Sequence, residues 1–339
     1  MFYFYKLLFL FSLMMGTMIS ISSYMWMSMW IGLEINLLSM IPLMSSNSNS
    51  TLSSEAMLKY FITQSLASTM LLFSIIILSL NFMYNINMNF YMMLMMNTAL
   101  FMKMGAAPFH FWFPEVIEGL NWNNSFIMFT WQKIAPMILI MYSNFTLLYT
   151  SMIIIISSLI SGIMGMNQVS LRKILTYSSI NHISWMLSSM LFMETIWIYY
   201  FMIYSIITLN IILIFKKFNI FYIKQLFISL NNKPMIKFFF ILNFLSLSGL
   251  PPFLGFMPKW LTIQSLINNN LYSISFIIII MTLMTLYFYM RITLSTLILS
   301  MNEISYFYNN KNMNMNWIYT INFISIFSLI FITILFNFN

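Results

Sequence analysis

Long apolar segments follow one another along almost the whole chain. Polar clusters, prolines and glycines divide the chain into eleven candidates of roughly 20 residues, the length that an α-helix needs to cross a bilayer. Only helices and closed barrels can cross, and these non-alternating segments are helical. We therefore expect an all-α polytopic membrane protein with about eleven transmembrane helices. The expected helices cover residues 2–20, 24–44, 55–80, 88–112, 124–143, 146–166, 172–192, 195–215, 235–265, 271–298 and 317–337.

The scarcity of charge excludes a water-soluble protein. Only 6% of the 339 residues are charged, with 14 Lys and Arg and 6 acidic residues. Soluble domains carry about 25% charged residues, which they need to cover their surfaces. The composition therefore excludes a soluble enzyme, a disordered protein and a nucleic-acid-binding domain, and we expect no nucleic acid among the partners.

Few residues could hold a cofactor. The chain contains no cysteine and only two histidines, His110 and His182. This excludes disulfides, iron–sulfur ligation and zinc–thiolate sites. The eight glycines form neither a G-x-G-x-x-G motif nor a P-loop. We expect no cofactor and no metal in this chain.

The basic residues at the ends of the expected helices indicate an orientation. All of these bases fall on the same side of the membrane as the N-terminus. The loops on that side follow the even-numbered helices, and the loops on the opposite side carry no base. Because loops in the compartment of synthesis are enriched in Lys and Arg, the N-terminus is predicted there and the C-terminus opposite. The composition, rich in Met, Ile, Phe and Asn, suggests an organelle-encoded chain. The nine bases are Lys6, Arg172, Lys173, Lys216, Lys217, Lys224, Lys233, Lys237 and Lys311.

Four charged residues lie inside expected helices: Glu34, Lys103, Lys133 and Lys259. A charge at bilayer depth costs several kcal/mol, so such residues are candidates for function by default. The alternative is a structural ion pair that fixes helix register. Lys59, four residues after Glu55, fits either a rim ion pair or a proton path.

The two histidines also leave two interpretations open. His110 follows a Pro-Phe pair that interrupts its expected helix, and His182 lies on a polar helix face. Each could relay protons. Each could instead form hydrogen bonds that only pack helices together.

A short motif occurs twice, 144 residues apart. Gly105-Ala-Ala-Pro-Phe109 followed by Pro114-Glu115 matches Gly249-Leu-Pro-Pro-Phe253 followed by Pro258-Lys259. Proline removes a backbone hydrogen bond from a helix, so both spans should be discontinuous. The two spans are five helices apart and should run in opposite directions, as in the inverted repeats of ion-coupled transporters. We expect one transmembrane domain, 1–339, with approximate repeats 1–143 and 146–298 and a C-terminal helix.

Six segments together resemble the antiporter-like membrane subunits of mitochondrial respiratory complex I, and the resemblance runs from near Met15 to about Arg291. The resemblance implies two inverted five-helix repeats. The same resemblance implies that animal mitochondrial members lack three N-terminal helices found in bacterial relatives, and the eleven expected spans fit this shortened form. It also implies a polar axis made of the Glu34–Lys103 pair, a central Lys133 and a distal Lys259. The segments are GLEINLLSMIPL, SEAMLKYFITQSLAS, KMGAAPFHFWFPEV, TWQKIAPM, SLRKILTYSSINHISWML and FLSLSGLPPFLGFMPKW.

The resemblance further implies a function and partners. The chain would translocate protons across the mitochondrial inner membrane, with its N-terminus on the matrix side. It would be a subunit of the proton-translocating NADH:ubiquinone reductase, without redox catalysis of its own. NADH, FMN, iron–sulfur clusters and ubiquinone would bind partner subunits. Neighbouring antiporter-like subunits and membrane lipids would be its contacts. The alternatives are a free-standing cation/proton antiporter subunit and a purely structural membrane-arm subunit.

Overall fold

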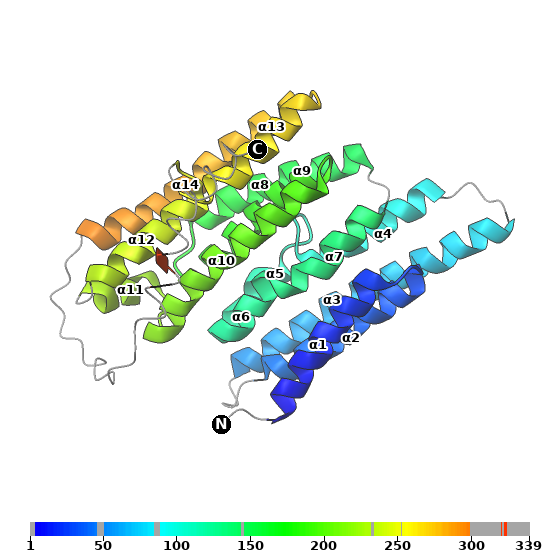
Figure 1. Cartoon of the computed structure of the whole chain (residues 1–339). Coiled ribbons are helices and arrows are strands. Elements are labelled where there is room, and N and C mark those ends of the chain that lie inside the picture. Colours follow the sequence, from blue (N-terminus) through cyan, green and yellow to red (C-terminus); the bar gives the residue numbers. More distant parts are fainter. Residues whose placement is uncertain are drawn as a thin grey trace. The chain divides into compact units, whose positions relative to one another are not determined.

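The computed structural model is helical throughout the residues that it describes (Figure 1). A single isolated β-bridge, between Ser170 and Tyr222, is the only other pairing found in this part of the chain. The expected helix 317–337 falls outside the described residues except for three positions, and Pro252, Lys233 and Lys311 also fall outside. The described residues are 4–45, 51–84, 89–143, 146–231, 234–251, 253–298, 320 and 322–323.

The chain divides into two compact units, Met1–Ser157 and Ser158–Asn339. In the first unit, α1 packs along α2, α3 contacts α2, α4 and α5, and α7 contacts α4. Its helices are α1 (Phe4–Ser22), α2 (Trp26–Met44), α3 (Thr51–Tyr84), α4 (Asn89–Met104), α5 (Trp112–Gly119), α6 (Trp122–Phe129) and α7 (Trp131–Tyr142), and α8 (Leu147–Met166) runs across the boundary.

In the second unit, α9 and α12 both contact α10, and α13 contacts α9, α10 and α14. The short helix α11 was not expected, because its sequence lies in a polar stretch. Leu226 and Leu230, one turn apart, are its buried residues and give it one apolar face. The helices are α9 (Leu171–Met190), α10 (Glu194–Phe218), α11 (Ile223–Asn231), α12 (Pro234–Ser248), α13 (Phe256–Asn268) and α14 (Tyr272–Ile298).

Seven of the expected spans are confirmed as long, apolar helices among the described residues. The span 124–143 is divided into α6 and α7 at Thr130. Pro136 lies inside α7 and has no N–H to donate to the carbonyl of Gln132, four residues earlier. Two further spans, 88–112 and 235–265, are the predicted discontinuous helices. Helix α9 is more polar than the others, yet most of its residues are buried.

The first part of each discontinuous helix ends in the same backbone arrangement. Helix α4 is followed by Gly105 (φ +74°) and helix α12 by Gly249 (φ +78°), in the left-handed region that favours glycine. Each glycine N–H and the following N–H donate back to the last turn of the helix, which is the Schellman arrangement. The four bonds are Gly105 N to Met102 O (3.2 Å), Ala106 N to Phe101 O (3.1 Å), Gly249 N to Ser246 O (3.1 Å) and Leu250 N to Leu245 O (3.4 Å).

The polar helix α9 satisfies its own hydroxyl groups. Ser178, Ser184 and Ser188 each donate to the carbonyl three residues earlier, at 2.6–2.8 Å. The amide of Asn181 reaches across to Thr285 on α14 (3.3 Å). Because these hydroxyl groups are bonded, their burial carries little cost, whereas Oδ1 of Asn181 and Nε1 of Trp185 are buried without a hydrogen-bond partner among the described residues.

We expect Gly105→Ala to destabilise the protein by about 1–2 kcal/mol, the cost of a left-handed conformation for an L-residue. The added Cβ would also lie 3.3 Å from Phe113. The measurement is the thermal unfolding midpoint of the purified, assembled protein. Gly162→Ala, in the interior of α8, is the control: its added Cβ would be similarly crowded, 3.2 Å from Cβ of Met284, but its φ is not positive, so it should cost less. Equal losses at the two positions would contradict this explanation of the break.

Candidate functional site

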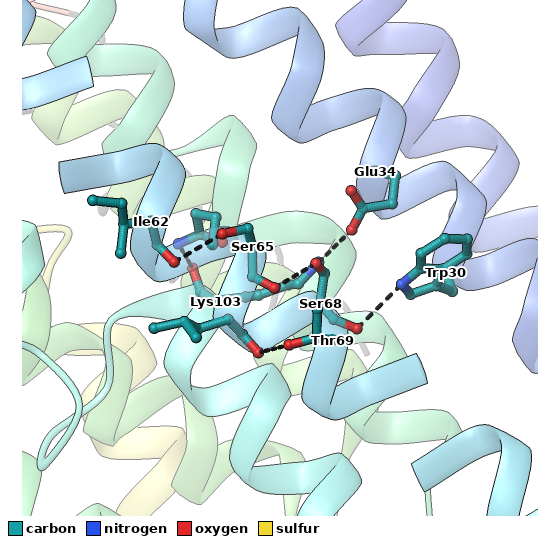
Figure 2. Close-up of polar contacts among 9 residues, drawn as sticks. Trp30, Glu34, Ile62, Ser65, Ser68, Thr69 and Lys103 are labelled. Atoms are coloured by element: carbon teal, nitrogen blue, oxygen red, sulfur yellow. Dashed lines mark hydrogen bonds and ion pairs between the residues drawn. The ribbon is translucent and has the colours of Figure 1, made fainter. Parts of the chain in front are cut away.

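An ion pair joins α2 and α4 in the first unit. The Nζ of Lys103 lies 3.9 Å from Oε1 of Glu34, and their side chains are 4% and 24% exposed. Figure 2 shows the Glu34 carboxylate directed at Lys103. This separation exceeds a direct hydrogen bond but still gives strong attraction where water is largely excluded. The pair predicted from sequence is therefore formed, at the point where α4 ends.

Neighbouring side chains bond the carbonyls at the end of α4. The indole of Trp112 donates to Met102 O (3.1 Å), and the amide of Gln64 on α3 donates to Lys103 O (3.5 Å). A break at membrane depth needs such partners, because lipid offers none. On the other side of the pair, Trp30, one turn before Glu34, donates to Ser68 O of α3 (3.2 Å; Figure 2).

Lys133 lies on the first turn of α7 and is 1% exposed. Its Nζ lies 5.3 Å from the centre of the Phe113 ring, within the range of a cation–π contact. Lys103 and Lys133 line the same small cavity, of about 10 Å³. The structure therefore brings Glu34, Lys103 and Lys133 into one site in the first unit.

Lys259 lies on the first turn of α13, in the second unit, and is 6% exposed. Its ammonium donates to Ser248 O (2.7 Å) and Leu247 O (3.3 Å), the last carbonyls of α12. Gly249 makes room for it, since a Cβ at that position would lie 2.7 Å from Cδ of Lys259. A cation at a helix C-terminus is also favoured by the helix dipole. Lys259 thus provides hydrogen-bond donors for the carbonyls at the second helix break.

His182 belongs to a buried aromatic cluster of α9 and α10 in the second unit. A hydrogen bond joins its Nδ1 to the hydroxyl of Tyr200 (2.9 Å), and the Tyr204 ring lies 5.0 Å away, centre to centre. Both tyrosines are 2% exposed. Nothing in the sequence separates these two tyrosines from the other aromatic residues of α10, so they were not predicted.

His110 is 2% exposed and lies in the break after α4. Its Nδ1 donates to the carbonyl of Pro108 (3.3 Å), so the break itself orients the ring. The relay and packing interpretations of both histidines stay predictions. In the described ranges, no three His, Asp or Glu side chains come together as a metal site.

Lys59 bridges two helices. Its ammonium lies 2.6 Å from Glu55 on the same helix and 2.7 Å from Glu115 on α5. The i, i+4 spacing predicted the pairing of Lys59 with Glu55, but no sequence signal pointed to Glu115. The bridge fixes the helix after the first break, α5, against α3.

Two discontinuous helices with buried lysines beside them define the class of antiporter-like membrane proteins. Residues 23–285 match the family model described as NADH:quinone oxidoreductase/Mrp antiporter, transmembrane. The chain belongs to this family, and within it to the NADH-ubiquinone oxidoreductase chain 2 proteins. It is 47% identical to that protein of Anopheles gambiae over 97% of both chains, and 39% identical to that of Loxodonta africana over 91% of this chain and 88% of the relative.

Solved structures share the fold. A chain of respiratory complex I from Thermus thermophilus superimposes with a TM-score of 0.84 at 19% identity, over 95% of this chain and 77% of that one. A chain of the Mrp complex from Dietzia superimposes with a TM-score of 0.73 at 16% identity, over 86% of this chain and 60% of that one. The expected antiporter-like fold is confirmed.

We expect Tyr200→Phe to lower stability by about 1–3 kcal/mol, because it leaves Nδ1 of His182 buried without its hydroxyl partner. The matched control is Tyr199→Phe, since Tyr199 is the adjacent residue and is 56% exposed. Thermal unfolding of the purified, assembled protein measures both. A control that loses as much as the Tyr200 variant would show that the hydrogen bond is not the cause.

Proposed function

We propose that this chain is a proton-translocating core membrane subunit of mitochondrial NADH:ubiquinone oxidoreductase. The observation that carries the proposal is the site in the first unit, where the Glu34–Lys103 pair and the buried Lys133 adjoin one cavity beside a broken helix. The names of the relatives, NADH-ubiquinone oxidoreductase chain 2, support the assignment to that enzyme. As a subunit, the chain would move protons while its partners perform the redox chemistry.

The pair provides a way to hold and release a proton. Burial favours the neutral form of an amine, and a neighbouring carboxylate favours the ammonium. With Glu34 ionised, Lys103 therefore keeps its proton. When Glu34 is neutralised or moves away, Lys103 gives up that proton, and the amine of Lys133 is the acceptor that shares its cavity.

The energy must come from outside this chain. Moving one charge against about 100 mV costs roughly 2.3 kcal/mol. We assign NADH, FMN, the iron–sulfur clusters and ubiquinone to partner subunits. Neighbouring antiporter-like membrane subunits are also among the proposed partners of this chain. We also propose that the chain lies in the mitochondrial inner membrane, in contact with its lipids, with its N-terminus on the matrix side.

Lys259 is proposed as the distal proton-carrying residue. Its two bonds to backbone carbonyls of α12 also give it a structural task. Releasing its proton would remove one donor of three and need not break both bonds, because a neutral amine keeps two N–H groups. The two tasks are therefore compatible.

We expect Lys133→Met to reduce proton pumping by roughly 100-fold or more, as for the loss of a proton-transfer group. Methionine keeps most of the volume of this buried side chain. The measurement is the initial rate of proton pumping by the assembled complex in sealed vesicles, with NADH as the electron donor. Lys216→Met, at an exposed position on the last turn of α10, is the control and should pump normally. Unchanged pumping by the Lys133 variant would overturn the proposal.

Glu34→Gln separates transport from a purely structural role. The amide keeps the shape of the side chain but removes the charge beside Lys103. We expect the complex to assemble and its pumping to fall roughly tenfold or more, since the loss of a partly buried charge partner is worth over 1.4 kcal/mol. Native gel electrophoresis measures assembly, and vesicle acidification measures pumping. Lost assembly with unchanged pumping per complex would support the structural alternative instead.

A further inference from the structure

Two small cavities adjoin the lysines of the first unit. The larger, about 20 Å³, reaches from α2 to α7 and is lined by Asn36, Gln64 and Pro136 among others. The smaller, about 10 Å³, contains Lys133 in its wall. Three residues line both cavities, so the two spaces adjoin at these side chains. The three shared residues are Tyr60, Lys103 and Gln132.

The cavities have the size and the polarity that water needs. A buried water molecule requires about 10–15 Å³ of such space and two to four polar partners. The larger cavity exceeds this volume and the smaller one lies at its lower limit. Amide, hydroxyl and ammonium groups stand in their walls, whereas cavities that stay empty of water are lined by apolar groups alone.

Gln132 is the shared residue that most needs a water molecule. The nitrogen of its side-chain amide is inaccessible to solvent and has no hydrogen-bond partner in the described part of the chain. A buried donor left unbonded is costly. In addition, Pro136 cannot donate to the carbonyl of Gln132 and lines the same larger cavity. The unbonded amide of Gln132 therefore lies beside a space of the size of water.

We propose that Gln132 is a positioning residue that holds water between the Glu34–Lys103 pair and Lys133. The proposal rests on the proposed function and adds the connection between its two lysines. The ammonium of Lys103 gives one proton to the water, and the water gives one of its protons to the neutral amine of Lys133. One N–H bond breaks at Lys103 and one forms at Lys133, so the water is unchanged. Gln132 takes no proton and only orients the water.

The first test is a map of the wild-type complex at a resolution that shows water. We expect an ordered water molecule within about 3.2 Å of the Gln132 amide that also forms a hydrogen bond with Lys103 or Lys133. Cavities without water, or water that does not contact Gln132, would overturn the proposal. This measurement needs no variant.

The second test is Gln132→Met, which keeps the length of the side chain and removes its hydrogen bonds. We expect pumping to slow about fivefold to tenfold, the equivalent of one hydrogen bond. The solvent deuterium isotope effect on pumping should also change, which a merely structural role would not cause. Gln168→Met is the matched control, since the Gln168 amide donates to Met164 in the second unit (3.2 Å) and should leave both values unchanged.

Comparison with Lys133→Met separates the two levels of the hypothesis. If the Lys133 variant fails to pump while Gln132→Met keeps the wild-type rate and isotope effect, the positioning role is wrong and the proposed function stands. If the Lys133 variant pumps normally, the proposed function itself is wrong. If the Gln132 variant does not assemble, the water position in the wild-type map decides the proposal.

Discussion

Backbone carbonyl groups at the two helix breaks must form hydrogen bonds within the protein, because hydrocarbon offers no partner. The rest of the site depends on how this is achieved. After α4, the carbonyls of Met102 and Lys103 accept from Trp112 and Gln64. After α12, Lys259 itself donates to the last two carbonyls. Polar side chains therefore gather at the breaks, and the functional candidates are among them.

Three buried lysines have three different environments. Lys103 faces a carboxylate, Lys133 packs against the ring of Phe113, and Lys259 bonds to backbone carbonyls. A proton bound at each lysine is therefore held by a different force. Under the proposed function, these different environments give the three sites different proton affinities, which would set where the proton resides.

The sequence predicted the helices and their breaks better than the contacts between side chains of different helices. The apolar segments predicted the long helices, because span length depends only on local composition. The shared motif predicted both breaks, since glycine and proline act on their own backbone. In contrast, α11 was missed because its short sequence lies in a polar stretch. Three contacts were also missed: the ion pair of Glu115, the hydrogen bond of Tyr200 and the place of Gln132 in the cavity wall. Each of them involves residues of another helix.

The sequence by itself determined that this chain is a helical membrane protein with two discontinuous helices and four charged residues at depth. These properties follow from residue type and spacing along one segment. Only the tertiary structure decided that Glu34 reaches Lys103, that Lys133 shares a cavity with that pair, and that Lys259 bonds to the end of α12. The physical reason is that such contacts depend on which faces of distant helices pack together, and residue spacing does not encode this choice.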